Sequence, residues 1–444
     1  MKNSDCVLLR RVVGLSWPVI LEMSGVMMAG ALMTAMVGRL GAVELAAVGI
    51  ATMTQLASAM VVAAFGTGAS AIVGRESGAG LWEDVRQTAG QALLLGLLIG
   101  ILVACVGFLG ARSLLLRLIG AEPAVAALAG ELLKILFLFT PALLMMSIAN
   151  AVLRGIAKTR TAFFIATFSN VLSILLSYAL IYGVAAPPLG VAGVAWGTGV
   201  AQLAGGLTAL AVVRQDRHIR LRWQNIAAWQ PVTIKKILRI SLPAAMEQAA
   251  LQGGRVTFTF MLTGLGAVQF AAHQIAMQVE SLSFLPGFGF SVGIMTLVAQ
   301  SLGKKRYRQA ERLVRTTGWL AVVSMTLMAA VFLLFAKPLT TLFIADPEVV
   351  YWGTFCVMLA AFEQPTIGVS YVLAGALRGA GDTRWPMVVT TIGVWIFRLP
   401  AIYLSIRFWG GTIVSVWMIT AVDFLIRSLI LLWRFRKGDW KQLS

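Results

Sequence analysis

The sequence predicts an all-α polytopic membrane protein with twelve transmembrane helices, arranged as two six-helix lobes related by a pseudo-two-fold axis along the membrane normal. Three observations predict this fold: long apolar runs, a duplication of the chain, and basic residues that gather in alternate loops. Of the 444 residues, 59% are hydrophobic and only 12% are charged. A soluble domain carries roughly twice that share of charged residues.

The apolar runs are long enough to span a bilayer as helices. A run of about 20 residues crosses a hydrocarbon core of about 30 Å. The predicted spans cover residues 12–36, 45–73, 87–111, 124–150, 160–184, 191–213, 238–262, 268–300, 310–336, 348–375, 383–406 and 412–435. The first six form the N-lobe, residues 1–213, and the last six form the C-lobe, residues 238–444. The polar segment 214–237 is the predicted cytoplasmic linker.

The two lobes repeat each other at an offset of 224–225 residues. The matches retain proline, arginine and glutamate, so apolar bias alone does not explain them. The matching segments are Leu15–Glu22 with Ile240–Glu247, Leu40–Ala51 with Leu265–Ala276, and Leu153–Arg160 with Leu377–Arg384. Because each lobe has an even number of spans, both enter the membrane from the same side, which is the parallel-repeat arrangement of some transporters.

Several prolines lie inside the predicted spans, and each removes a backbone hydrogen bond and permits a kink. Pro18 and Pro243 lie in the first span of each lobe, and Pro141 and Pro365 lie in the fourth. Kinked helices that bend during a transport cycle and kinks that serve static packing both fit this pattern.

The net charge of +18 follows the positive-inside rule rather than a nucleic-acid surface. One side of the membrane receives the linker, the Lys304–Arg315 cluster and the C-terminal tail. The other side receives little beyond Arg39, Arg112, Arg117, Lys337 and Arg407. We therefore expect a multi-pass protein of the plasma (inner) membrane with both termini in the cytoplasm, and no nucleic-acid partner.

Motifs for catalysis and cofactor binding are absent from the sequence. The three cysteines are scattered without metal-ligand spacing. There is no phosphate-binding lysine loop, no His/Cys cluster and no serine elbow. We therefore expect neither an enzyme nor a resident cofactor.

Charged residues near the middle of the bilayer are the candidate functional residues, because each costs at least about 2.5–3.5 kcal/mol unless it has a partner or a function. Glu247 and Glu280 have no basic residue three or four positions away. The candidate residues for cation coupling or substrate binding are Glu22, Glu247, Glu280, Glu363, Asp423 and Arg398.

These carboxylates allow two functional interpretations and one structural one. Burial raises the pKa of a carboxyl group, which would let it bind and release protons near neutral pH. The same groups, when ionised, would bind a sodium ion. In the structural interpretation, Asp423 pairs with Arg427 four residues later, and Arg398 ties either Glu363 or Asp423.

The chain resembles the multidrug and toxic compound extrusion (MATE) family over essentially its whole length. The similarity rests on the duplication and on three motifs: Leu-Gly-Ala-Val at 40 and 265, Ala-Ala-His-Gln-Ile-Ala at 271–276, and Leu-Arg-Gly with Thr-Arg at 153–160 and 377–384. The resemblance is strongest to the NorM-like branch. Three positions depart from the acidic residues usual in that family: Met33, Leu251 and Ile367.

The resemblance implies a secondary antiporter, expected as a monomer, that exports drug-like organic molecules, often cations, in exchange for protons or sodium ions. Its expected partners are these small molecules and membrane lipid. The alternative is a flippase for lipid-linked precursors in the same superfamily, which would favour a large basic cleft. The deep charges here are mostly acidic, which favours the antiporter.

Overall fold

The computed structural model describes residues 3–114, 123–184 and 187–441, and these residues form helices joined by short turns without any β-strand. Arg117, one of the few basic residues on the predicted outer side, lies outside them. The chain divides into two compact units. We call Leu21–Ala245 the N-unit, and Met1–Ile20 together with Met246–Ser444 the C-unit.

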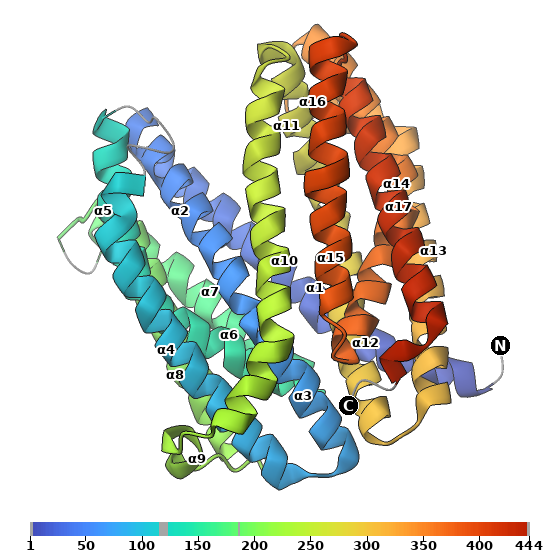
Figure 1. The fold of residues 1–444 in the computed structure, drawn as a ribbon. Helices are drawn as coiled ribbons and strands as arrows, with labels where there is room; N and C mark the ends of the chain where they lie inside the picture. The colour runs from blue at the N-terminus through green and yellow to red at the C-terminus, as the bar shows by residue number, and fades with distance from the viewer. Residues whose placement is uncertain (1–2, 115–122, 185–186, 442–444) are drawn as a thin grey trace. The chain divides into compact units, whose positions relative to one another are not determined.

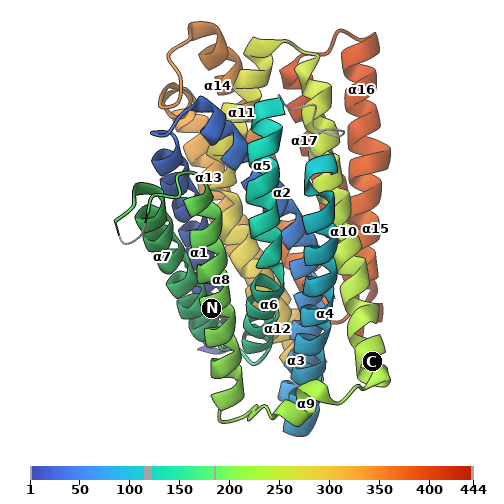
Figure 2. The same ribbon diagram turned by 90° about the vertical axis from the view of Figure 1, so that its left-hand side faces the viewer.

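The N-unit packs its helices around an apolar core that includes Leu93, Ile148 and Leu153. Helices α7 and α8 lie side by side, and α6 contacts α3, α4 and α8 (Figure 2). The helices that contribute to this unit are α1 (Asn3–Val37), α2 (Ala42–Ala63), α3 (Phe65–Ala79), α4 (Trp82–Leu114), α5 (Pro123–Leu138), α6 (Thr140–Gly155), α7 (Thr159–Tyr182), α8 (Ala192–Gln215), α9 (Trp223–Ala227) and α10 (Pro231–Thr263).

The C-unit has a core in which α14 contacts α11, α12, α13 and α17 (Figure 1). Phe332, Val357 and Trp417 are buried there. Its helices, besides the shared α1 and α10, are α11 (Ala267–Ser281), α12 (Phe284–Gly303), α13 (Tyr307–Thr341), α14 (Pro347–Gly379), α15 (Arg384–Thr391), the π-helix η2 (Ile392–Arg398), α16 (Leu399–Phe408), α17 (Ile413–Lys437) and the short 3₁₀ helix η3 (Asp439–Lys441).

The protein is a multi-pass membrane protein. Every one of the twelve predicted spans is helical. Within the described ranges, ten helices are long and apolar enough to cross a membrane, or eleven when α5 and α6, bent by 49°, count as one. The remaining predicted span, 238–262, lies in α10, which is not among them and which carries charged residues such as Arg239 and Arg255.

Three predicted spans are broken into two helices each. The breaks fall at Ala64 between α2 and α3, at Phe139 between α5 and α6, and at Leu282 and Ser283 between α11 and α12. Pro141 lies in the first turn of α6, where its missing N–H is harmless. Pro18, Pro243 and Pro365, in contrast, lie inside continuous helices.

Helices α1 and α10 each contribute residues to both units. In each helix the boundary between the units falls at an equivalent residue of the repeat. The division falls after Ile20 in α1 and after Ala245 in α10. In the C-unit, a Cβ on Gly293 would lie 2.5 Å from the Ser16 hydroxyl, and in the N-unit a Cβ on Gly68 would clash with the Ser241 hydroxyl. Each glycine thus permits the close approach of a helix. The two contacts are equivalent, because Ser16 and Ser241, like Gly68 and Gly293, are separated by the repeat offset of 225 residues.

The predicted linker is folded against the N-unit rather than extended. Ile219 and Leu221 are buried. The Gln91 side chain donates to the carbonyl groups of Asn225 (2.9 Å) and Ala228 (2.5 Å) and accepts from the backbone N–H of Gln230 (3.0 Å). Helix α10 then begins within the predicted linker, at Pro231. The lobe boundaries predicted from the repeat, at residues 213 and 238, stay a prediction.

Candidate functional site

The structure brings five of the six candidate residues into the C-unit and leaves Glu22 in the N-unit. Glu247 lies on α10, Glu280 on α11, Glu363 on α14, Arg398 at the end of η2, and Asp423 on α17. All four C-unit carboxylates are buried, with at most 3% of the residue exposed.

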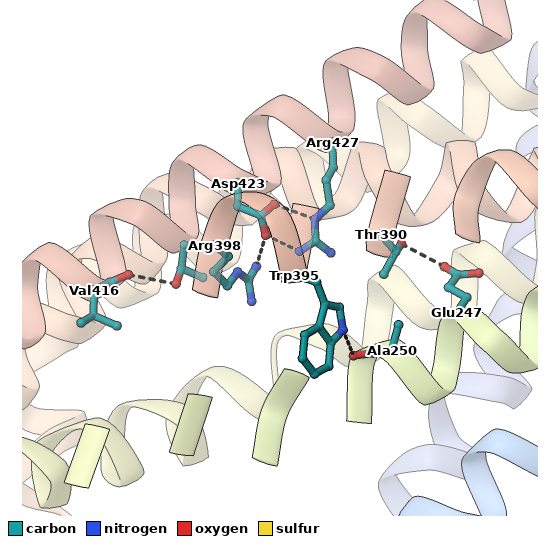
Figure 3. Close-up of polar contacts among 9 residues, drawn as sticks. Glu247, Ala250, Thr390, Trp395, Arg398, Val416, Asp423 and Arg427 are labelled. Carbon is teal, nitrogen blue, oxygen red and sulfur yellow. Dashed lines mark hydrogen bonds and ion pairs between the residues drawn. The ribbon is translucent and has the colours of Figure 1, made fainter. Parts of the chain in front are cut away.

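Asp423 is bound by two arginines at once (Figure 3). Arg427 Nε donates to Oδ1 at 2.8 Å, and its Nη2 pairs with Oδ2. Arg398 Nη2 lies 2.6 Å from the same Oδ2. Both guanidinium groups also lie over the ring of Phe424, an arrangement that favours a cation. This trio has one anion and two cations, so it carries a formal charge of +1.

The π-helix η2 positions Arg398. A π-turn widens the helix locally, and such turns are frequent at functional sites. Gly393 has no room for a Cβ, because one would clash with Arg427 Nε and would lie 2.5 Å from Asp423 Oδ1. The Trp395 indole N–H donates to the Ala250 carbonyl at 3.0 Å, which fixes η2 against α10 (Figure 3).

Glu280 and Glu363 form a buried carboxyl pair beside this trio. Their carboxyl groups lie within hydrogen-bonding reach of each other. In the described ranges, no other donor reaches Glu280 Oε1 or either carboxyl oxygen of Glu363. Arg398 is the cation that acts most strongly on both groups, without an ion pair to either. Two like charges in such contact repel each other, and one proton shared between the two carboxyl groups would relieve that repulsion.

Glu247 and Glu22 have arginine partners instead. Glu247 Oε1 accepts from Arg378 Nη2 at 2.7 Å and from the Thr390 hydroxyl at 3.2 Å, the latter drawn in Figure 3. In the N-unit, Glu22 Oε1 accepts from Arg154 Nη2 at 2.6 Å. The two pairs are equivalent in the repeat, and both arginines belong to the Leu-Arg-Gly motif. Their symmetry indicates that both halves use this ion pair to hold their fold.

The Glu280–Glu363 pair, in contrast, has no counterpart in the first half. At the offset of the surrounding motifs, Glu280 corresponds to Gln55 and Glu363 to Phe139, two residues before the matching prolines Pro141 and Pro365. The first half therefore has no carboxylate at either position, and its chain breaks between α5 and α6 at Phe139, whereas α14 continues through Glu363. Because the repeat does not conserve these two acids, they are good candidates for functional residues.

The structure adds two residues, Tyr371 and Arg255, to the candidates identified from the sequence. Tyr371 is within electrostatic range of Glu280 and Glu247, and Arg255 acts on both Glu280 and Tyr371. Tyr371 has no distinguishing feature in the sequence, because an uncharged aromatic residue is common inside an apolar span. His273 is buried, and its ring packs against Phe258 and Trp417.

A duplicated, all-helical membrane protein with a buried, incompletely paired carboxyl cluster belongs to the class of secondary transporters. The chain belongs to the MatE family, whose model matches residues 18–179 and 243–404. It is 28% identical to the probable multidrug resistance protein NorM of Thermotoga maritima over 92% of this chain and 88% of that protein. It is 27% identical to the multidrug resistance protein MdtK of Pectobacterium atrosepticum over 94% and 96% of the two chains.

Solved structures share the fold. A crystal structure of MATE in complex with MaL6 superposes with a TM-score of 0.89 at 20% identity and covers 100% of both chains. A mutant of the Vibrio cholerae MATE transporter VcmN gives a TM-score of 0.90 at 21% identity, covering 99% of this chain and 100% of that one. The predicted fold class and the predicted family are thereby confirmed.

Proposed function

We propose that this protein exports drug-like organic molecules in exchange for protons, and that the Glu280–Glu363 pair is the proton-binding site. Family membership and the multidrug relatives support export and argue against an enzyme. The observation that carries the site is the buried carboxyl pair, because its two groups contact each other and neither forms an ion pair with any residue that the structure describes. The relatives named above are multidrug resistance proteins, which favours export over the flippase alternative.

The charge balance explains how the pair would couple proton binding to export. The three carboxyl groups of Glu280, Glu363 and Asp423 lie near three guanidinium groups, those of Arg255, Arg398 and Arg427. When every group is ionised the cluster is neutral, and one proton on the pair brings it to +1. The positive cluster repels an organic cation, whereas the neutral one does not. Proton binding and cation binding therefore oppose each other, which is the requirement for antiport.

Asp423 takes no proton in this scheme. It is fully buried, yet two arginines neutralise it, and removing one partner from such a pair leaves an uncompensated charge. We propose that it holds Arg398 in place, so that Arg398 stabilises the ionised form of the carboxyl pair. Glu22 and Glu247 keep their arginines throughout the cycle.

We further propose that the protein acts as a monomer in the plasma (inner) membrane, with both termini on the cytoplasmic side. The basic residues of the linker, the Lys304–Arg315 cluster and the C-terminal tail support this orientation, because positively charged loops are retained in the cytoplasm. A proton entering through about 100 mV supplies roughly 2.3 kcal/mol per charge. That free energy sustains a tens-fold gradient of a neutral substrate. The exchange of one proton for a monovalent cation moves no net charge, so the pH gradient drives it.

The test is efflux of ethidium from vesicles that contain the purified protein, with a proton gradient or a sodium gradient imposed separately. We expect export with the proton gradient alone. Glu280→Gln and Glu363→Gln should each reduce it to background. Glu348→Gln is the matched control, because Glu348 is an exposed acid on the same helix as Glu363, and it should leave export unchanged.

Two outcomes would contradict this proposal in different ways. Export driven by sodium alone would make sodium the coupling ion. Full proton-driven export by both glutamine variants would remove the pair from the coupling site.

A further inference from the structure

A hollow lined by basic residues lies at the turn between α12 and α13 in the C-unit. It is shallow and open to solvent, and its polar lining consists of Arg11, Gln300, Ser301, Lys304, Arg306 and Gln309. Arg11 comes from α1, and the others come from the end of α12 and the start of α13. The hollow thus lies at the ends of two helices that are long and apolar enough to cross a membrane, where we expect lipid headgroups to meet water.

The turn holds two of these cations in a fixed geometry. The Arg306 N–H donates to the Ser301 carbonyl and the Lys305 N–H to the Leu302 carbonyl, both at 2.9 Å. This pair of hydrogen bonds is the usual C-terminal end of a helix that is followed by a residue in the left-handed backbone conformation. Glycine normally takes that position. Here it is Lys305, with φ 56°. Lys304 and Arg306, on either side of Lys305, both line the hollow.

The cations of this hollow have no anionic partner in the described parts of the chain. Arg11, Lys304 and Arg306 are exposed, and none of the ion pairs found there includes them. The lining contains no carboxylate. Three neighbouring cations without an anion repel one another weakly in water, and a bound anion would relieve this repulsion.

The first half of the chain provides an internal comparison. At the same offset of 225 residues, Arg11 corresponds to Lys236 and Ser301 to Glu76, and there Glu76 Oε1 binds Lys236 Nζ at 3.3 Å. The remaining positions also differ in charge. Arg75, Ala79, Leu81 and Asp84 stand where the second half has Gln300, Lys304, Arg306 and Gln309, so the first-half set has two cations and two anions. The turn itself is the same, with Gly80 in place of Lys305 and the Leu81 N–H bound to the Glu76 carbonyl at 3.0 Å.

The fold of this turn therefore does not require the cations, because the first half forms it with a balanced set of charges. We propose that the hollow is a binding site for a phosphate group, supplied by the headgroup of an anionic phospholipid. Lys and Arg donate charge-assisted hydrogen bonds to phosphate oxygens, and basic pockets at helix ends on the cytoplasmic side are suited to such headgroups. Free phosphate has the same chemistry, so the experiment must separate the two sources.

The experiment measures lipid bound to the full-length protein by native mass spectrometry after exchange into mixed micelles of phosphatidylglycerol and phosphatidylcholine. The triple variant Arg11→Gln, Lys304→Gln, Arg306→Gln should bind phosphatidylglycerol at least about tenfold more weakly, since each basic residue near an anionic lipid contributes about fivefold. The matched control is Lys305→Gln, Arg308→Gln, Arg312→Gln, which removes the same charge from exposed neighbours outside the lining and should change binding less than about twofold.

A single substitution provides a second test. Ser301→Glu introduces the acid that the first half has at this position. The new carboxylate should pair with Arg11 as Glu76 pairs with Lys236, and it should abolish selective binding of phosphatidylglycerol.

An equal loss of phosphatidylglycerol binding in both triple variants, or no loss in either, would contradict the proposed site. Displacement of phosphatidylglycerol by millimolar inorganic phosphate would show that free phosphate is the ligand and that the lipid is not. These readouts measure binding, so they do not depend on the proposed antiport.

Discussion

Glu22 and Glu247 are equivalent residues of the two halves, and each binds the arginine of a Leu-Arg-Gly segment more than 130 positions away. The Glu247 side chain is 4% exposed and that of Arg378 19%, so the pair lies mostly away from water. The Glu22 side chain is 7% exposed and that of Arg154 17%. Such similar environments make each pair a control for the other.

Removing one partner should therefore destabilise the protein in the same way in each half. We expect Glu247→Gln and Glu22→Gln each to lower stability by about 3 kcal/mol, because each leaves a largely buried guanidinium without its anion. The double variant Glu247→Gln, Arg378→Gln should recover most of the loss. Thermal unfolding in detergent measures this. If Glu247→Gln instead keeps its stability and loses proton-driven export, Glu247 belongs to the coupling site.

The charged residues near the middle of the membrane could be identified from the sequence, but most of their interaction partners could not. Six charged residues at mid-membrane positions stand out because burial makes them costly. The Asp423–Arg427 contact was accessible because the two residues lie one helical turn apart. Glu247 lacked a local partner because Arg378 comes from another helix, and only the tertiary fold brings them together. The Glu280–Glu363 contact likewise joins α11 and α14, which no periodicity connects.

At the scale of elements, hydropathy located the spans but not their interruptions. The break at Phe139 precedes a proline, but Pro18 and Pro365 lie in unbroken helices, so proline alone does not predict a break. The π-helix η2 has no proline or charge pattern of its own. It is stabilised by packing, in which Gly393 accommodates the Asp423–Arg427 pair and Trp395 binds Ala250.

The linker is the element whose structure departs most from its polar composition. Its first residue after α8, Asp216, binds the Lys158 ammonium group and accepts from the N–H groups of His218 and Ile219 at 3.0 and 3.4 Å. Burial by itself would raise the pKa of the Asp216 carboxyl group, but these donors outweigh it and hold the pKa below its ordinary value. Asp216 therefore anchors the linker in its ionised form.

This anchor should weaken in acid. A carboxyl group with a lowered pKa stabilises the folded state above the pKa of the unfolded chain, near 3.8, and loses this contribution as the pH falls through the folded value. Asp216→Asn should thus lower stability by about 1 kcal/mol at pH 7. The difference from the unmodified protein should shrink as the pH falls below 3.8 and through the lower pKa of the folded protein. Thermal unfolding across this pH range measures the difference. A difference that persists unchanged at low pH would show that the charge of Asp216 is not the cause.

At the scale of the whole molecule, the duplication is visible in both sequence and structure. The Ser16–Gly293 and Ser241–Gly68 contacts repeat at the same offset, as do the Glu22–Arg154 and Glu247–Arg378 pairs. The two halves differ where charge is concentrated. The second half alone has the carboxyl pair and the basic hollow, so the differences between the halves identify the candidate sites more clearly than either half by itself.

The orientation of the chain in the membrane decides which leaflet the basic hollow meets, and α13 offers a direct measurement of it. Lys305 precedes this helix and Lys337 lies near its end, and both are exposed. About 30 helical residues separate them, which at about 1.5 Å per residue exceeds the thickness of the hydrocarbon core. In a background without the natural cysteines, Lys337→Cys should react with a membrane-impermeant maleimide on intact cells. Lys305→Cys should react only after the membrane is permeabilised. The reverse pattern would place the basic loops outside and direct the hollow toward the outer leaflet.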